Sequence, residues 1–170
     1  MSTCKIIIAG FPGVGKSYAG GTNSAVIDLE SSNFHWIEDS NGVKHQHPEW
    51  PINYVNAIKI IACESEGLES MKDVRYVLIS THNEILKMLK DANIPFIIYA
   101  PKSKNAALKR YRDRGSSEQF IESLNENWDN YMNDLEQLEM PMIRSDVYLK
   151  DALDRRGAYG CMMERINKLK

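Results

Sequence analysis

Short apolar runs alternate with longer stretches of helical periodicity along this chain. The apolar runs are rich in β-branched and aromatic residues and predict five strands, at residues 5–9, 25–29, 75–80, 95–99 and 142–144. Strands that alternate with helices are typical of an α/β fold with a parallel sheet. The pattern therefore predicts a five-stranded parallel sheet with helices on both faces.

Apolar residues at helical spacing predict helices over residues 51–66, 82–92, 103–114, 117–138 and 158–169. In the longest of these, one apolar stripe predicts a buried face, formed by Phe120, Leu124, Trp128, Tyr131 and Leu135. We expect Trp128 and Tyr131 to belong to the core.

The helix that follows the first strand is expected to be short. Lys16, where this helix begins, and Asp28, which lies in the second strand, stand close together in the sequence. Gly20 and Gly21 are poor helix formers. We therefore expect one or two helical turns that stop at the glycine pair.

Residues 34–50 interrupt the alternation of strands and helices. Asn41-Gly42 is a strong signal for a two-residue hairpin turn, and aromatic residues and histidines flank it. The segment predicts an insertion that is carried above the sheet.

The composition is that of one domain of ordinary size, residues 1–170, of which 43% are hydrophobic. A net charge of −2 and a pI near 6.1 give no general signature of nucleic-acid binding. The overall charge does not exclude a local basic groove formed by Lys44, Lys102, Lys104 and Lys109. Because no apolar run reaches membrane-spanning length and the first strand occupies the N-terminus, we expect a cytoplasmic protein with no membrane partner.

A phosphate-binding motif directly follows the first apolar run. Residues 10–17 read Gly-Phe-Pro-Gly-Val-Gly-Lys-Ser, a complete Walker A sequence between a predicted strand and a predicted helix. Lys16 of such a loop reaches the β- and γ-phosphates, and the Ser17 hydroxyl is a ligand for Mg²⁺. The motif predicts binding of ATP or GTP by Gly10, Pro12, Gly13, Val14, Gly15, Lys16, Ser17 and Tyr18.

Two acidic residues stand where the second predicted strand ends. Asp28 and Glu30 are two positions apart, so they point to the same side at the edge where open parallel sheets bind ligands. One carboxylate there is suited to hold the Mg²⁺ shell. The other is suited to accept a proton from the acceptor substrate or to form a hydrogen bond with it. The alternative is that both are solvated carboxylates at a strand exit.

The phosphate loop, the Asp28-Leu29-Glu30 pair and the basic residues 109–115 together resemble the P-loop small-molecule kinases, the group of nucleoside monophosphate, shikimate and gluconate kinases. The resemblance implies a three-layer sandwich of the P-loop NTPase type. It also implies that residues 103–118 form a lid and that residues 34–66 form a substrate-binding insertion. In shikimate-kinase-like members an Asp-x-Asp pair serves metal and acceptor, and here Asp28 and Glu30 occupy those places.

The predicted lid is rich in arginine, whose forked guanidinium suits phosphate oxygens. Arg110 and Arg114 are four positions apart and share a helix face, whereas Arg112 points elsewhere. We expect Arg110 and Arg114 to contact the transferring phosphate and Arg112 to make surface pairs. The alternative is a solvated basic helix.

Other nucleotide-binding classes lack their signals in this sequence. The third predicted strand ends at Ser80 and Thr81 with no carboxylate, which argues against ATPases of the AAA type, while either hydroxyl could hold a Mg²⁺-bound water. The only Asn-Lys pair, Asn167-Lys168, stands at the C-terminus and cannot be the base-reading motif of a GTPase.

The acceptor pocket is expected between the second strand and the insertion. Ser31, Phe34, Trp36 and His82 are candidate substrate contacts, since flat aromatic side chains suit a nucleobase. For Trp36 and Trp50, packing in the core is an equal alternative. The four histidines match no standard zinc spacing, so His82 is expected to bind substrate or to cap a helix.

These features predict an ATP-dependent phosphotransferase that uses Mg²⁺ and moves the γ-phosphate to a small acceptor, a nucleotide or a nucleoside, as in the nucleotide kinases that phages encode. One alternative is a kinase that acts on the hydroxymethyl group of a modified pyrimidine in phage DNA. Another is a nucleotide-binding regulator without transfer activity.

Overall fold

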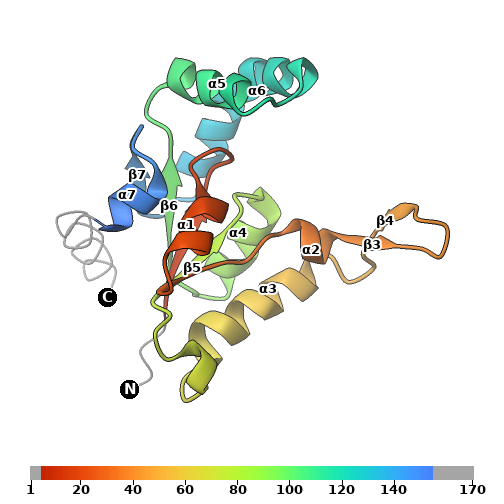
Figure 1. Ribbon diagram of the computed structural model, residues 1–170, viewed down its shortest axis with the longest axis vertical. Coiled ribbons are helices and arrows are strands. Elements are labelled where there is room, and N and C mark those ends of the chain that lie inside the picture. The colour runs from red at the N-terminus through yellow and green to blue at the C-terminus, as the bar shows by residue number, and fades with distance from the viewer. Residues whose placement is uncertain (1–4, 155–170) are drawn as a thin grey trace.

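The computed structural model describes residues 5–154 (Figure 1). Its centre is a five-stranded, all-parallel sheet in the order β2-β5-β1-β6-β7, which confirms the predicted α/β class. The strands agree with the predicted runs to within two residues at either end: Ile6–Gly10 (β1), Val26–Asp28 (β2), Tyr76–Ile79 (β5), Phe96–Ala100 (β6) and Met142–Arg144 (β7). β5 and β6 are buried along their whole length, as expected for strands covered on both faces.

Most of the predicted helices are present with small changes in their bounds. They are Lys16–Thr22 (α1), Ile52–Lys59 (α3) with a π-helical continuation Ile60–Glu64, Asn83–Asp91 (α4), Lys104–Asp113 (α5) and Glu118–Glu136 (α6). Three short helices were not predicted: Ser32–His35 (α2), a 3₁₀ turn Glu69–Met71 and Leu149–Asp154 (α7). The helix predicted over residues 158–169 lies outside the described residues.

The strand order determines where the helices lie. From β1 the chain crosses to β2 at one edge of the sheet. From β2 it then returns through β5 and β6 to β7 at the other edge. Right-handed crossovers therefore place α1 on one face and α3 and α4 on the other. Accordingly, α1 contacts α7 and α3 contacts α4. The α5–α6 hairpin stands above the carboxyl edge of the sheet (Figure 1).

α1 is as short as predicted, at 7 residues, but it continues through Gly20 and Gly21 and ends at Thr22, one residue beyond the glycine pair where it was expected to stop. Gly20 faces β2, and a Cβ there would lie 2.8 Å from Asp28 Cβ and 3.1 Å from its backbone nitrogen. Gly21 has nothing near its Cβ position. The glycine at position 20 thus allows the helix to approach the strand closely, which is a packing requirement that helix propensity does not reveal.

α6 buries a stripe that differs from the predicted one. The buried residues are Ile121, Leu124, Trp128, Met132 and Leu135. Trp128 is a core residue as expected, whereas Tyr131 is 43% exposed and Phe120 39% exposed. Both of these aromatic residues stand one position before a buried one, which rotates them by about 100° away from the core. The predicted core position of Tyr131 is therefore wrong.

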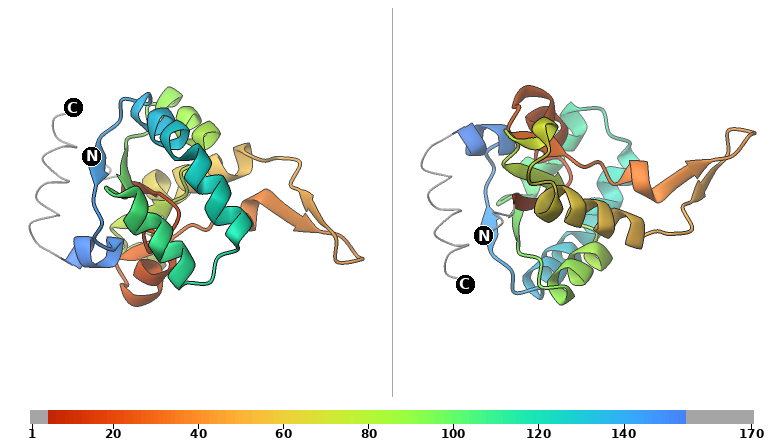
Figure 2. Two further views of the ribbon diagram at one scale, coloured as in Figure 1. Left: turned by 90° about the horizontal axis from the view of Figure 1, so that it is seen from above. Right: turned by 90° about the horizontal axis from the view of Figure 1, so that it is seen from below.

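Residues 34–50 contain a hairpin that projects from the body of the molecule (Figure 2). Its strands are Trp36–Glu38 (β3) and Lys44–Gln46 (β4), and all six side chains are exposed. The turn is longer than the predicted two residues. The Asp39 N–H donates a hydrogen bond of 3.0 Å to the Val43 carbonyl, the Gly42 N–H donates one of 3.0 Å to the Asp39 carbonyl, and Gly42 is left-handed at φ +79°. The loop is thus Ser40-Asn41-Gly42, closed by a glycine bulge.

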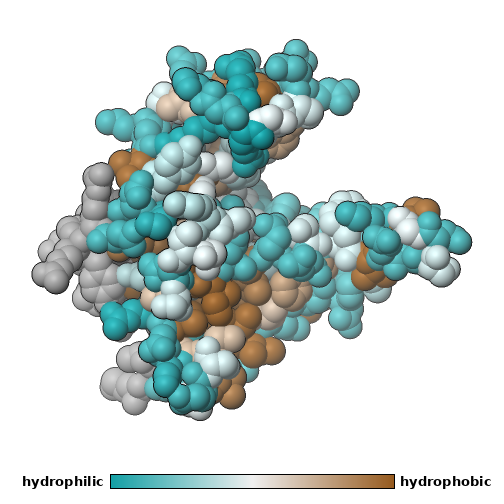
Figure 3. Space-filling view, viewed as in Figure 1, coloured by the Kyte–Doolittle hydropathy of each residue, from teal (hydrophilic) through white to brown (hydrophobic). Residues whose placement is uncertain are grey.

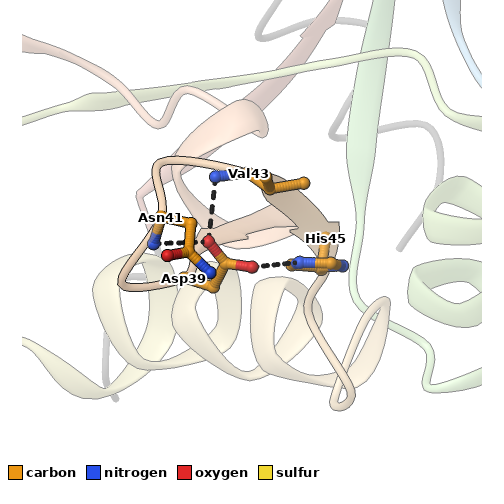
Figure 4. A network of polar contacts seen from close by, with 4 residues as sticks. All are labelled: Asp39, Asn41, Val43 and His45. Atoms are coloured by element: carbon orange, nitrogen blue, oxygen red, sulfur yellow. Dashed lines mark hydrogen bonds and ion pairs between the residues drawn. The ribbon is translucent and has the colours of Figure 1, made fainter.

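The Asp39 side chain explains the longer turn (Figure 4). Its Oδ1 accepts hydrogen bonds from the backbone N–H groups of Asn41 and Val43, at 2.9 and 3.0 Å, and its Oδ2 lies 2.8 Å from His45 Nε2. These partners, His45 foremost, hold the pKa of Asp39 below its usual value. An aspartate that captures two amides stabilises the wider loop over a two-residue turn.

Within residues 5–154, no helix combines the length and the apolar character that crossing a membrane requires.

Candidate functional site

The phosphate loop lies at the point where the direction of the sheet connections changes. β1 stands between β5 and β6, and the chain leaves β1 toward β2 but leaves β6 toward β7. Adjacent strands whose connections diverge open a crevice at their carboxyl ends, which is where open α/β sheets bind ligands. Residues 10–17 occupy this crevice.

Two left-handed glycines shape the loop, Gly13 at φ +81° and Gly15 at φ +92°. No side chain caps the start of α1 at Gly15, so the first N–H groups of the helix face the loop without a protein side-chain partner. Lys16 folds back, and its Nζ donates a hydrogen bond of 2.8 Å to the Gly10 carbonyl. Burial lowers the pKa of Lys16, while Asp28 and Glu30 act in the opposite direction.

A pocket of about 410 Å³ opens in front of this loop. Its walls come from four places in the chain: the loop and α1, the end of β2, the end of β5, and the residue after α5. The lining residues are Pro12, Gly13, Gly15, Lys16, Ser17, Tyr18, Leu29, Glu30, Ser31, Ser80, His82 and Arg114. The tertiary structure thus brings six of the eight predicted loop residues to one site with Glu30, Ser31, His82 and Arg114. The predicted residues Gly10, Val14, Asp28 and Trp36 do not line this pocket.

The two predicted carboxylates occupy different environments. Glu30 is exposed and lines the pocket, whereas Asp28 is half-buried at the end of β2, with an Oδ1 atom that is buried and has no hydrogen-bond partner. Burial raises the pKa of Asp28, and the Ser17 hydroxyl and Lys16 oppose that rise. A carboxyl group with an unpartnered oxygen beside a serine hydroxyl is a donor set that suits a hard divalent cation or its bound water.

The predicted pair of lid arginines is split. Arg114 lines the pocket, with its Cζ 4.6 Å from the centre of the Tyr111 ring and its Nε donating a hydrogen bond of 2.9 Å to Ser116 Oγ. Arg110 instead donates a hydrogen bond to the Asp146 carbonyl. Its Cζ lies 4.1 Å from the centre of the Tyr148 ring. Arg114 caps the end of α5 and its N–H still donates a hydrogen bond of 3.1 Å to the Arg110 carbonyl, so the two residues share a helix face as expected, and it is the partners of their guanidinium groups that differ.

Aromatic rings form a stack that runs from the core to the base of the hairpin. The His35 ring lies between Trp36 and Trp50, with ring centres 4.3 and 4.2 Å away, and Trp50 stacks in turn on Tyr54. Trp50 is buried and its Nε1 donates a hydrogen bond of 2.8 Å to Glu84, whereas Trp36 is 45% exposed. Packing is therefore the role of Trp50, while Trp36 presents its indole at the surface.

Ser31 and His82 connect this stack to the pocket. Ser31 Oγ lies 3.4 Å from His82 Nε2, and the edge of the His82 ring faces the rings of His35 and Trp50. Burial lowers the pKa of His82, so the imidazole is neutral at pH 7. Phe34, the fourth predicted substrate residue, is half-buried against Tyr54 and does not line the pocket.

Tyr54 joins the ends of two strands beneath the pocket. Its hydroxyl donates a hydrogen bond of 2.6 Å to the Leu29 carbonyl and accepts one of 3.3 Å from the Ser80 N–H. Burial is the main reason that the pKa of Tyr54 rises to about 12, so it remains a donor. Ser80 Oγ is also buried without a partner, next to the pocket that it lines.

Sequence reasoning missed three residues at this site. Tyr111 contacts the loop at Pro12, Tyr148 lies against Gly15, and His35 links the two tryptophans. The tyrosine within the arginine-rich segment was the one available signal, because an aromatic residue among charged ones often marks the buried face of a helix.

A larger hollow of about 660 Å³ lies at the opposite, amino-terminal edge of the sheet, beside Ala25 and Tyr76. It contains none of the predicted site residues, and the chemistry that the sequence indicates is concentrated at the carboxyl edge. Among residues 5–154, no three His, Cys, Asp or Glu side chains cluster as a metal site would require.

No protein-family model matches this chain, and no curated protein matches it significantly.

Proposed function

We propose that this protein is an ATP-dependent phosphotransferase of the P-loop kinase type, which moves the γ-phosphate to a nucleotide or a nucleoside. The observation that carries the proposal is the convergence of the Walker A loop, Glu30 and Arg114 on one pocket, with the half-buried carboxyl group of Asp28 beside Ser17. In a regulator that only binds nucleotide, an acidic residue for an acceptor and an arginine that lines the pocket would have no role.

The loop supplies the phosphate contacts in this proposal. Its backbone N–H groups hold the phosphate oxygens, and Lys16 exchanges the Gly10 carbonyl for the β- and γ-phosphates. Ser17 and the unpartnered Asp28 oxygen would hold Mg²⁺ or its bound water. When bound, the ion neutralises charge on the phosphates. Arg114 stabilises the charge that develops on the transferring group.

Glu30 faces the acceptor side of the pocket. For a hydroxyl acceptor, Glu30 orients the hydroxyl and takes its proton, while Asp28 stays with the Ser17 hydroxyl. For an acceptor that is already a phosphate, no base is needed and Glu30 only positions the ligand. Ser31 and the neutral His82 supply hydrogen-bonding groups on the same wall, and the aromatic stack behind them suits a flat base.

The direct test is transfer of labelled γ-phosphate from ATP to a panel of nucleosides, nucleoside monophosphates, shikimate and gluconate, with Lys16→Ala as the blank. We expect transfer to one nucleoside or nucleotide class that Lys16→Ala abolishes. Binding of ATP with no transfer to any acceptor would instead support the regulator, and transfer to shikimate or gluconate would correct the acceptor class.

A second candidate is a kinase of a hydroxymethyl-pyrimidine within DNA. The observation that favours it is the projecting β3–β4 hairpin with the exposed indole of Trp36 at its base, a geometry that extends beyond what a free nucleoside needs. Figure 3 shows that the molecule is indented between the α5–α6 part and this hairpin. The hairpin carries Glu38 and Asp39 as well as Lys44, so its charge alone does not favour DNA.

The two acceptors are separated by offering hydroxymethyldeoxyuridine as a free nucleoside and within a single-stranded or double-stranded oligonucleotide. Preferential transfer to the oligonucleotide, reduced in Trp36→Ala, would establish the second candidate. Equal use of the free nucleoside would favour the first.

A further inference from the structure

Tyr111 lies in α5 and contacts the middle of the phosphate loop. Its side chain is fully buried, and its hydroxyl donates a hydrogen bond to the Pro12 carbonyl. The ring also fills the space beside Gly13, where a Cβ would lie 2.8 Å from Tyr111 Cε1. A side chain on the helix thus contacts two consecutive residues of the loop.

The hydrogen bond to Pro12 determines the orientation of the peptide that follows. This peptide is trans, because the only cis bond among residues 5–154 is Trp50-Pro51. In a trans peptide, the carbonyl of one residue and the N–H of the next point in opposite directions. With the Pro12 carbonyl held toward Tyr111, the Gly13 N–H points away from Tyr111. Pro12 and Gly13 both line the pocket, and Tyr111 does not, so this direction leads toward the pocket.

The same ring supports Arg114. The guanidinium Cζ lies 4.6 Å from the ring centre, within the range of a cation–π contact. Phe120, near the start of α6, packs edge-on against Tyr111 at 5.3 Å between ring centres and thereby holds the ring from another side. One buried tyrosine therefore contacts both the phosphate loop and the arginine at the pocket mouth.

We propose that Tyr111 is a positioning residue for phosphate binding: it turns the Gly13 N–H toward the phosphate and carries Arg114 over the same pocket. This inference rests on the proposed function, since it assumes that the loop binds a nucleotide triphosphate. Burial raises the pKa of Tyr111 far above its usual value, so the hydroxyl remains a donor at every pH at which the protein is assayed.

The test compares Tyr111→Phe, which removes only the hydroxyl, with Tyr99→Phe as the matched control. Tyr99 is also buried, and its hydroxyl donates a hydrogen bond of 2.7 Å to the carbonyl of Val147, which lies outside the phosphate loop. Calorimetric titration with MgATP and with inorganic tripolyphosphate gives the dissociation constant for each protein. We expect binding of both ligands to weaken about five- to tenfold in Tyr111→Phe, as for the loss of one neutral hydrogen bond. Tyr99→Phe should bind like the wild type.

Thermal unfolding of both variants separates this role from a loss of packing, since each change removes a buried hydroxyl that donates to a backbone carbonyl and should lower the melting temperature by a similar amount. Replacement of Tyr111 by 4-aminophenylalanine keeps a donor at the same ring position and should restore wild-type affinity. This third protein also provides the comparison if Tyr111→Phe does not fold.

The outcomes distinguish the inference from the function on which it rests. Unchanged affinity in a folded Tyr111→Phe protein, with a wild type that binds, would overturn the positioning role alone. A wild type that binds neither MgATP nor tripolyphosphate would overturn the proposed function and the inference together. Equal weakening in Tyr111→Phe and Tyr99→Phe would show a general effect of destabilisation and would also reject the positioning role.

Discussion

At the scale of single residues, Asp28 lowers the stability of the protein at a position where the proposed function needs a carboxylate. Its Oδ1 is buried with no hydrogen-bond partner, and burial raises the pKa of the carboxyl. A carboxylate that is ionised while one of its oxygens is buried without a hydrogen-bond partner lowers the stability of the protein without ligand. In the proposed function, a cation or its bound water would pair with this oxygen.

We expect Asp28→Asn to raise the free energy of unfolding at pH 7, by up to about 1 kcal/mol, while it reduces phosphate transfer. Since the folded-state pKa of Asp28 is raised, wild-type stability increases as the pH falls through that pKa toward the usual value of 3.8, and the advantage of asparagine shrinks. Urea unfolding at pH 7 and pH 4.5 measures this. Glu30→Gln is the control, because Glu30 is exposed and its neutralisation should leave stability unchanged. A less stable Asp28→Asn protein at pH 7 would contradict the prediction.

The arginines of residues 103–118 differ in their surroundings, and their substitutions should differ accordingly. Arg114→Ala removes a positive charge at the pocket and should lower kcat by about a hundredfold. Arg112→Ala is the matched control, since Arg112 is exposed near the end of α5, two residues before Arg114, and does not line the pocket. Steady-state transfer kinetics with the identified acceptor provide the measurement, and equal rates for the two variants would show that this segment is only a basic surface helix.

Arg110 is informative in a different way. Its guanidinium is held by the Asp146 carbonyl and the Tyr148 ring, away from the pocket lining. A loss of kcat in Arg110→Ala as large as that in Arg114→Ala would mean that Arg110 leaves these partners when nucleotide binds.

At the scale of elements, α1 shows that two adjacent glycines serve different purposes. Gly20 meets Asp28 of β2, and Gly21 has open space at its Cβ position. We expect Gly21→Ala to stabilise the protein by about 0.5–1 kcal/mol, because alanine is the better helix former. Gly20→Ala should instead destabilise it, because the new methyl group would be forced against the strand. Chemical unfolding of the two variants checks this, and similar effects of both would show that α1 does not pack closely on β2.

The elements also show how local signals combine. α5 and α6 begin at Ser103 and Ser117, whose hydroxyls accept the N–H groups of Ala106 and Phe120, and both starts agree with the sequence pattern. The hairpin was predicted from Asn41-Gly42, but its loop is one residue longer because the Asp39 side chain binds the turn amides. The pattern thus located the turn, and a competing side-chain interaction determined its type.

At the scale of the whole molecule, the pocket exists only in the folded state, since its walls come from the loop and α1 and from the chain that follows β2, β5 and α5. A ligand that binds the folded chain and not the unfolded one raises stability by about 2.7 kcal/mol at a hundred times its dissociation constant. We therefore expect MgATP to raise the melting temperature by roughly 5 °C or more. Lys16→Ala should show little of this shift, and chelation of Mg²⁺ should reduce it. No shift at millimolar MgATP would contradict the phosphate-binding role.

The sequence by itself determined the five strands, the main helices and the phosphate loop, because each depends on residues that are neighbours in the chain. An apolar run forms a buried strand whatever its position in the sheet. The glycines of residues 10–17 allow their own backbone to adopt the conformation of the loop. Even the exception in α6 is local, since Tyr131 stands one position from the buried stripe.

Only the tertiary structure decided which distant side chains meet. Tyr111 and Pro12 are 99 positions apart, Arg110 donates a hydrogen bond to the distant Asp146 carbonyl, and Gly20 lets α1 approach Asp28 closely. The physical reason is that these contacts depend on the crossovers and on how closely the layers pack, and neither periodicity nor propensity encodes those distances. The sequence therefore determined which candidate groups the chain carries, and the packing of the helices against the sheet decided which of these groups lie together.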